Sequence, residues 1–281
     1  MKQEPLPKSL PVNGEGLQKT RGNQPPITTL DVKGISTAQI VHGEGPPVVL
    51  LHGWGAHSGL MWPLVERLAP LGYRCYVPDL PGFGQTPPPP EAWSVFDYAA
   101  WVLALLEANG LERVHLFGHS FGGRLGLILG AEHPERLVKM VLADSAGVRP
   151  KPSTTGSLRL KVYRAALNAL RGAGLQAQAE RLRGWYGSRY GSADYKAAAG
   201  VMRETFVKVV NEDLLPYAAR VKVSTLLFWG DRDADTPLEQ GRLLERTIPD
   251  AGLVVWEGAG HYSYLERAAD TARVMDHFFR Q

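Results

Sequence analysis

The sequence predicts a protein of the α/β class, with a mostly parallel sheet of eight strands flanked by helices and a helical segment inserted between two strands. Two observations carry this prediction. Short apolar runs alternate with amphipathic helical stretches along most of the chain, as in strands joined by crossover helices. That alternation stops over about residues 150–217, where the composition is helical, and it resumes afterwards.

Composition narrows the class of protein further. The 281 residues are 44% hydrophobic and 21% charged, which suits a globular chain with one sizeable core. Apolar stretches are too short for a membrane span, and the N-terminus lacks the apolar core of a secretory signal. A net charge of +3 without a basic stripe argues against a nucleic-acid partner. Cys75, as the single cysteine, excludes an intramolecular disulfide and favours a cytoplasmic location.

The first part of the chain supplies the early strands. Residues 1–26 are rich in Pro, Gly, Lys and Gln and are expected to form a flexible arm. TTLDVKG and STAQIVHG follow as two edge strands of a hairpin, and PVVLLHG (47–53) is a strand buried on both faces. A helix over about 60–69, the strand RCYVPDL and an amphipathic helix over 94–109 come next.

The later elements repeat the pattern. VHLFGHS is a strand, FGGRLGLILGAEH a helix and VKMVLADS a strand. After the helical segment, strands are expected in VSTLLFWGD (223–231) and GLVVWEG (252–258), and a helix over about 264–280. Doubly wound sheets bind ligands at the carboxyl ends of their strands, so the inserted helices are expected to form a cap over that edge. The expected organisation is an arm (1–26), a core (27–149 and 218–281) and a cap (150–217).

A candidate nucleophile lies in GHSFGG (118–123), which fits G-x-S-x-G between an apolar strand and an apolar helix. Side chains two residues either side of the serine would collide with neighbours on such a strained turn, which explains the glycines. Ser120 would stand at a helix N-terminus, where backbone N–H groups favour negative charge. We therefore predict Ser120 as the nucleophile.

The base that activates a serine is commonly a histidine. His261 lies in the glycine-rich loop WEGAGHYSYLE after the last strand, and it follows the nucleophile in the chain, so it is the predicted base. His119 adjoins the nucleophile but is expected to point elsewhere. Four other histidines are expected to be structural: His42, His115, His133 and His277.

A carboxylate must orient the imidazole. GDRDADTP offers Asp231, Asp233 and Asp235 directly after a buried strand, and we favour Asp233. Asp144, in LADSAG after the preceding strand, stays open as the alternative because geometry rather than sequence position defines a triad.

Ester hydrolysis builds negative charge on the former carbonyl oxygen, and preorganised N–H donors must stabilise this oxyanion. HGWG (52–55) follows the third strand, and the expected donors are the backbone N–H groups of Trp54 and Phe121. His52 is expected to hold this loop by hydrogen bonds rather than to transfer protons.

Five segments in order resemble the motifs of the α/β-hydrolase superfamily, over roughly residues 28–281. LLHGWG resembles its oxyanion loop, VPDLPGFGQT its loop after the fourth strand, LFGHSFGG its nucleophile elbow, LLFWGDRDADTP its acid loop and GAGHYSYLE its histidine loop. The resemblance implies the α/β-hydrolase fold and a capped serine hydrolase, with no cofactor or metal ion. Capped dehalogenases and epoxide hydrolases use an aspartate nucleophile, so Ser120 disfavours both.

The cap is expected to select the substrate. Residues 151–192 contain eight basic residues and one acidic residue, Glu180, which argues against a cationic substrate. The eight are Lys151, Arg159, Lys161, Arg164, Arg171, Arg181, Arg183 and Arg189. We expect most of them on a solvated helix face, with attraction of a carboxylate-bearing substrate as the alternative. The aromatic residues Trp185, Tyr186, Tyr190 and Tyr195 are expected to pack the cap, and some to line the pocket.

Three functions remain after these steps. The first is hydrolysis of a small-molecule carboxylic ester through an acyl-enzyme on Ser120. The second is cleavage of a carbon–carbon bond of the meta-cleavage type, which would use the basic cap. The third is a non-catalytic ligand receptor on the same fold, which an intact triad disfavours.

Overall fold

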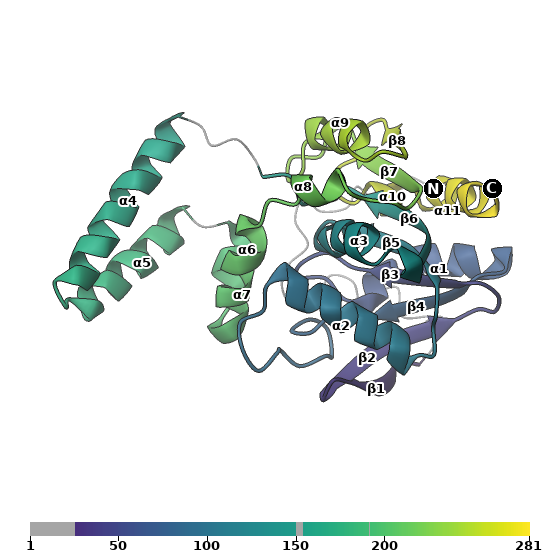
Figure 1. Cartoon of the computed structure of the whole chain (residues 1–281), viewed down its shortest axis with the longest axis horizontal. Helices are drawn as coiled ribbons and strands as arrows, with labels where there is room; N and C mark the ends of the chain where they lie inside the picture. Colours follow the sequence, from purple (N-terminus) through teal and green to yellow (C-terminus); the bar gives the residue numbers. More distant parts are fainter. Residues whose placement is uncertain (1–25, 150–153, 191) are drawn as a thin grey trace, which may run out of the picture.

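The computed structural model describes residues 26–149, 154–190 and 192–281, so nearly all of the expected N-terminal arm lies outside the described residues. One eight-stranded sheet forms the centre, in the order β1-β2-β4-β3-β5-β6-β7-β8 (Figure 1). The strands are β1 (Thr28–Val32), β2 (Ile35–His42), β3 (Pro47–Leu51), β4 (Arg74–Pro78), β5 (Val114–His119), β6 (Leu137–Ala143), β7 (Thr225–Gly230) and β8 (Ala251–Trp256).

Most of the sheet is parallel, as expected. The hairpin of β1 and β2 is antiparallel, and β2 also pairs antiparallel with β4. From β4 to β8 every neighbouring pair is parallel. The prediction that both strands of the hairpin are edge strands is wrong for β2, because β2 lies between β1 and β4 and forms hydrogen bonds with both. The short β1 alone forms that edge.

Two apolar layers cover the two faces of the sheet. Along β3, Val49 and Leu51 join the cluster formed with α2 (Val95–Ala108) and α3 (Phe121–Glu132). Val48 and Leu50 point to the opposite face and join the cluster with α1 (Trp62–Leu68) and α11 (Ala268–Arg280). This alternation follows from the two-residue period of a strand, and it explains why β3 is apolar at every position.

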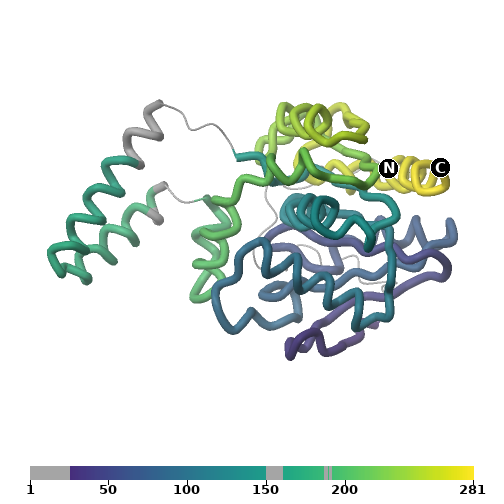
Figure 2. Tube along the Cα trace, in the orientation of Figure 1, coloured from purple at the N-terminus to yellow at the C-terminus, as the bar shows by residue number. Residues whose placement is uncertain are grey.

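Five helices lie between β6 and β7 in the described residues, as the composition of this segment predicts. They are α4 (Thr154–Gly172), α5 (Gln176–Tyr190), α6 (Ala193–Ala197), α7 (Gly200–Asn211) and α8 (Leu215–Ala218). Helices α4 and α5 form a hairpin that projects from the body of the molecule, whereas α6 and α7 lie against the core (Figures 1 and 2). The rings of Tyr163 and Tyr186 stack between the two projecting helices, with centroids 3.9 Å apart. Assignment of 150–217 as a cap domain stays a prediction.

The C-terminal segment differs from the single helix expected over 264–280. Arg267, at φ −121° and ψ 36°, separates α10 (Ser263–Glu266) from α11, because its backbone is not helical. In the remaining chain, α9 (Leu238–Thr247) links β7 to β8. Within the described part of the chain, no helix combines the length and the apolar content needed to cross a bilayer.

Helix α2 supports the start of α3 and begins at a capping box. Ser94 Oγ accepts a hydrogen bond from the Asp97 N–H, and the Asp97 carboxylate accepts one from the Ser94 N–H at 2.7 Å. One turn later, the ring of Tyr98 packs edge-on against Phe121, the first residue of α3, with centroids 5.0 Å apart.

We expect Ser94→Ala to lower the free energy of unfolding by about 1 kcal/mol, because the hydroxyl that satisfies a free N–H of α2 is lost. Urea denaturation measures the change. Ser94→Thr keeps a hydroxyl at the same position and serves as the control, which should lose clearly less. Equal losses in the two variants would show that the capping hydrogen bond is not the cause.

Candidate active site

A strained turn presents Ser120 at the carboxyl end of β5. Ser120 follows the last residue of β5 directly and precedes α3, with φ 50° and ψ −105°. Positive φ at a residue other than glycine costs free energy and persists only where surrounding contacts impose it. Here the Ser120 N–H donates to the Ala143 carbonyl and the Ser120 carbonyl accepts from the Ala146 N–H, both at 3.1 Å. The turn is therefore tied to the end of β6.

The glycines of the elbow permit close backbone approach, as the sequence predicts. A Cβ on Gly118 would lie 2.6 Å from the Gly122 carbonyl oxygen, and a Cβ on Gly122 would lie 2.2 Å from the Leu51 carbonyl oxygen. At Gly123 a Cβ would lie 2.2 Å from Ser145 Oγ. The first residues of α3 can thus pack directly onto β3 and β6, which positions the serine above the sheet.

Ser120, His261 and Asp233 form a continuous hydrogen-bonded chain. His261 Nε2 lies 3.0 Å from Ser120 Oγ, and His261 Nδ1 lies 2.8 Å from Asp233 Oδ2. The carboxylate only accepts, so Nδ1 carries the proton and Nε2 is free to accept from the serine hydroxyl. The three predicted side chains, which lie far apart in the sequence, therefore meet in the arrangement that general-base activation of a hydroxyl requires.

The Asp233 carboxylate is buried and held by further donors. Its Oδ1 accepts hydrogen bonds from the N–H groups of Asp235 and Thr236, at 2.8 and 2.9 Å, and Thr236 Oγ1 lies 2.6 Å from Oδ2. Burial alone would raise the pKa of Asp233. The hydrogen bond and charge of His261, with the Thr236 donors, outweigh burial and lower that pKa, so the group is ionised at neutral pH.

Opposite influences act on the imidazole. Burial lowers the pKa of His261, but the hydrogen bond and charge of Asp233, with the charges of Asp144 and Asp235, more than offset it and leave the pKa raised. An imidazole with this environment is a stronger base than a free histidine, and it is stabilised when it takes up a proton.

Asp144, the alternative acid, occupies a different place. Its Oδ1 accepts from the Gly230 N–H at 2.9 Å, and its Oδ2 accepts from the N–H and hydroxyl of Ser263 at 3.1 and 2.6 Å. Burial raises the pKa of Asp144 to about 8 against these hydrogen bonds. In the described residues the carboxylate partner of His261 Nδ1 is Asp233, and Asp144 instead joins the ends of β6 and β7 to the histidine loop.

Of the two expected oxyanion donors, Phe121 directly follows Ser120, and Trp54 lines the same cleft as the serine. Phe121 is the first residue of α3, so its N–H has no acceptor within the helix. The ring of Trp54 packs edge-on against Phe83, Phe121 and Phe206, with centroid distances of 4.8, 5.4 and 5.1 Å. These contacts fix the loop that carries the Trp54 N–H.

His52 holds this loop, as predicted. Its Nε2 accepts from the Leu80 N–H at 3.0 Å, so Nδ1 bears the proton and donates to the Gly53 carbonyl at 2.7 Å. Burial lowers the pKa of His52 to about 4, which keeps the ring neutral.

Sequence reasoning missed His119 and Thr236. His119 was expected to point elsewhere than to the site, but its Nε2 donates to the His261 carbonyl at 2.7 Å and its ring packs on the rings of Tyr262 and Tyr264. Burial and the neighbouring His261 lower the pKa of His119 to about 3, so it acts as a neutral donor. Thr236, three residues after Asp233, carries the spacing of a local side-chain turn, which could have identified it.

The four histidines expected to be structural do not line the cleft that contains Ser120. His115 stacks on Phe279 with centroids 4.1 Å apart, and His42 packs edge-on against Trp62. His133 ends α3, and His277 lies on the exposed side of α11 beside Gln281. These positions agree with the structural roles expected of them.

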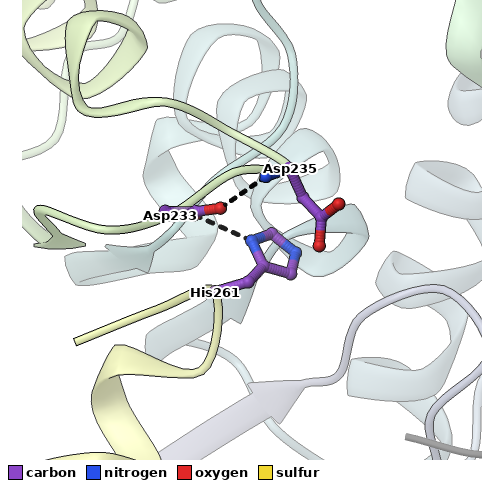
Figure 3. Close-up of side chains that lie close together, drawn as sticks. All are labelled: Asp233, Asp235 and His261. Atoms are coloured by element: carbon purple, nitrogen blue, oxygen red, sulfur yellow. Dashed lines mark hydrogen bonds and ion pairs between the residues drawn. The ribbon is translucent and has the colours of Figure 1, made fainter. Parts of the chain in front are cut away.

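Asp233, Asp235 and His261 each bring one potential metal-ligand atom within 4.8 Å of the others (Figure 3). Asp233 Oδ2 and His261 Nδ1 already share a hydrogen bond, while the Asp235 carboxylate takes no part in it (Figure 3). A cation bound by all three would have to displace the proton that orients the imidazole. The donor set is therefore better explained by the hydrogen-bonded chain than by a metal site.

An open cleft of about 2700 Å³ contains Ser120 and His261. Core loops and the helices α6 and α7 both line it, and its apolar lining includes Trp54, Met202 and Phe206. Tyr195 also lines the cleft, as expected for some aromatic residues of this segment, whereas Trp185 is 58% exposed.

The basic residues of the projecting hairpin are mostly exposed. Arg171 and Arg183 each lie 3.9 Å from Glu180, at the distance limit of an ion pair. None of the six basic residues whose side chains are described lines the cleft. The expectation of a solvated face is met where side chains are described; Lys151 and the side chain of Arg159 lie outside that part.

Comparison with known proteins identifies the family of the fold. The family model for the alpha/beta hydrolase fold matches residues 46–268. The chain is 29% identical to a 2-hydroxy-6-oxo-6-phenylhexa-2,4-dienoate hydrolase of Comamonas testosteroni, over 93% of this chain and 98% of the relative. It is also 29% identical to a pimeloyl-[acyl-carrier protein] methyl ester esterase of Chromobacterium violaceum, over 83% and 94%. Among solved structures, an esterase from Exiguobacterium antarcticum superposes with a TM-score of 0.70 at 22% identity, covering 90% of this chain and 99% of the other.

Gly122→Ala should lower the free energy of unfolding by about 3 kcal/mol or more, since the new methyl group meets a backbone oxygen of β3 that cannot move aside. Chemical denaturation gives the value. The matched control is Gly184→Ala on α5, where a Cβ has no neighbour within 4 Å. Alanine there should be neutral or stabilise by up to about 1 kcal/mol. A stable Gly122→Ala protein would refute the close approach.

Proposed function

This chain belongs to the alpha/beta hydrolase fold family, and from that premise we propose that it is a serine hydrolase that cleaves small-molecule carboxylic esters. The observation that carries the proposal is the hydrogen-bonded chain from Ser120 Oγ through His261 to the buried Asp233 carboxylate. Family membership alone leaves the reaction open, because one fold hosts many chemistries. The hydrogen-bonded side chains of Ser120, His261 and Asp233 favour a reaction in which the serine acts as a nucleophile.

The reaction begins when His261 Nε2 takes the Ser120 proton as Oγ attacks the ester carbonyl carbon. Collapse of the tetrahedral intermediate breaks the bond to the alcohol oxygen, which takes the proton from His261. Water then enters, gives a proton to His261 and attacks the acyl-enzyme. The acid leaves, and the proton returns to Ser120 Oγ. Asp233 stays ionised throughout and stabilises the imidazolium.

Two backbone N–H groups are assigned to the oxyanion. Negative charge develops on the former carbonyl oxygen, and the N–H groups of Phe121 and Trp54 would donate to it. Phe121 offers the free N–H of a helix start, where the helix dipole adds a favourable field. The packing of Trp54 against three aromatic rings supports this role, because preorganised donors require little rearrangement during the reaction.

The segment 150–217 acts as the cap in this proposal. Helices α6 and α7 line the cleft that contains the serine, so their side chains would contact the acyl or alcohol group. Apolar groups near Ser120 suit an acyl chain of small or medium length.

A carbon–carbon bond hydrolase is the second candidate. It is supported by the similarity to the Comamonas dienoate hydrolase. That relative and the methyl ester esterase are each 29% identical to this chain. The same serine, histidine and cleft would serve either reaction. Incubation with a 2-hydroxy-6-oxo-dienoate separates the two candidates: cleavage of that substrate with negligible ester turnover favours the carbon–carbon reaction.

Turnover of short-chain p-nitrophenyl esters tests the proposal. We expect wild-type turnover and a loss on the order of 10⁴- to 10⁶-fold in Ser120→Ala, because the residual rate comes from the oxyanion donors and binding alone. If the wild type does not turn over these esters, or if Ser120→Ala turns them over undiminished, the proposed ester hydrolysis is contradicted. A fluorophosphonate probe should label Ser120 in the wild type, and absence of labelling would favour a non-catalytic receptor.

The pH profile of kcat/KM should depend on Asp233. His261 must be neutral to accept a proton and its pKa is raised, so activity should fall as the pH drops through a value above the ordinary 6.5. Asp233→Asn removes the main groups that raise this pKa and leaves the lowering by burial. The inflection should therefore move to lower pH, with a plateau about 10⁴-fold lower.

The matched control for this profile is Asp231→Asn in the same loop. The Asp231 side chain accepts from the Gly258 N–H at 2.7 Å, and an amide oxygen can replace it there. Its profile should equal that of the wild type. An inflection that stays in place or rises in Asp233→Asn would contradict the assignment of the acid.

A further inference from the structure

Arg124 is a buried cation in the wall of the cleft. It lies one helical turn after Ser120 on α3, and only 7% of its surface is exposed. A buried charge is normally paired with an opposite charge or strongly hydrogen-bonded, because desolvation is costly. The partners of Arg124 therefore indicate whether its charge serves the fold alone.

The described residues leave this guanidinium largely unpaired. Nη1 donates to the backbone carbonyl of Glu212 at 3.0 Å, and no carboxylate of the described residues lies within ion-pair distance of it. The charges of Glu212 and Asp213 raise the pKa of Arg124, but burial outweighs them and lowers it to about 10, so the group is still cationic at neutral pH. A guanidinium offers five N–H donors in a planar fork, and one hydrogen bond to a carbonyl uses one of them.

The surroundings of Arg124 favour a ligand. It lines the same cleft as Ser120 and His261, and the lining of that cleft also includes the apolar side chains of Phe121, Val148 and Val209. Near such a low-dielectric wall, charge-assisted hydrogen bonds to a carboxylate are stronger than in water. The planar fork of arginine matches a carboxylate in two parallel hydrogen bonds.

Other arginines of the cleft differ from Arg124. Arg67, Arg232 and Arg267 are exposed, so water solvates their charges and little is gained by binding an anion there. The bond from Arg124 to the Glu212 carbonyl does satisfy the end of α7 (Gly200–Asn211), which is a structural role. That role needs a donor, and it leaves the burial of a full positive charge in the cleft unexplained.

We propose that Arg124 binds a carboxylate of the substrate, so that the preferred esters are those that carry a free carboxylate elsewhere in the molecule. This inference rests on the proposed ester hydrolysis and specifies its substrate class. The charged group would lie at the α3 wall of the cleft while the ester carbonyl lies at Ser120. A neutral ester of the same length lacks this partner and leaves the guanidinium unpaired.

The test compares p-nitrophenyl hydrogen glutarate, which has a free carboxylate, with methyl p-nitrophenyl glutarate, in which a methyl ester removes that charge; p-nitrophenolate release is followed for both, and the adipate pair varies the length. We expect the wild type to prefer the anionic ester in kcat/KM. Arg124→Met should reduce the ratio of anionic to neutral kcat/KM by about 10- to 100-fold, mainly through KM, because a hydrogen-bonded ion pair is lost. Arg124→Lys keeps the charge but not the planar fork, so its ratio of anionic to neutral kcat/KM should lie between those of the wild type and Arg124→Met.

Arg136→Met is the matched control. Arg136 also donates to backbone carbonyls, those of Leu111 and Glu112, but it does not line the cleft. Loss of such a structural hydrogen bond should affect kcat/KM for both esters alike and leave the ratio of anionic to neutral kcat/KM unchanged. An unchanged ratio in Arg124→Met, or a wild type with no preference for either anionic ester, overturns the proposal.

A binding measurement separates this inference from the proposed function. Titration calorimetry of glutarate into the Ser120→Ala variant, with glutaramide as the neutral analogue, needs no turnover. Glutarate binding that is lost when Arg124→Met is added supports the anion site even if no ester is hydrolysed. Equal binding of glutarate with and without Arg124 overturns it, even if the esterase activity is found. If Arg124→Met does not fold, Arg124→Lys and the wild-type ratio decide.

Discussion

Three loops that leave the carboxyl ends of β5, β7 and β8 have to meet at one point, and buried hydrogen bonds fix that meeting. The Ser120 turn is possible only because Gly122 lies against the Leu51 carbonyl, where no side chain fits. Two hydrogen bonds hold the histidine loop: His119 donates to the His261 carbonyl, and Asp144 accepts from the Ser263 hydroxyl. Proton transfer between Ser120 and His261, as proposed, would tolerate little displacement, so it would depend on these supports as much as on the three side chains themselves.

Two buried carboxylates within this region have opposite titration behaviour, and the environment of each explains the difference. Asp233 faces the imidazole and Thr236, which outweigh burial and favour its charged form. Asp144 is more completely buried and lies farther from a cation, so burial dominates and raises its pKa to about 8. Separation of two like groups in this way lets one orient the base while the other fastens loops, without the cost of two charges side by side.

In the proposed reaction the substrate would be selected by the cleft around Ser120 and not by the three side chains of the proposed triad. Apolar side chains from the core loops and from α6 and α7 form most of its lining, and the buried Arg124 supplies a charge at one wall. The basic residues of the α4–α5 hairpin lie outside the cleft and are solvated where described, so their number says little about the substrate. If Arg124 binds the substrate as proposed, this one buried cation on α3 would influence binding more than several exposed ones, because water screens exposed charges most strongly.

By itself the sequence determined the alternation of strands and helices, the glycines around Ser120 and the loops that carry His261 and Asp233. These features are local: each follows from the spacing of apolar residues or from the φ and space that one turn requires. Tertiary structure decided that β2 is interior, that Asp233 rather than Asp144 faces the imidazole, and that His119 reaches the His261 carbonyl 142 positions away. It also decided that Arg124 is buried with no carboxylate of the described residues within ion-pair distance. Each of these depends on which distant segments the sheet order brings together, and no local pattern in the chain encodes that order.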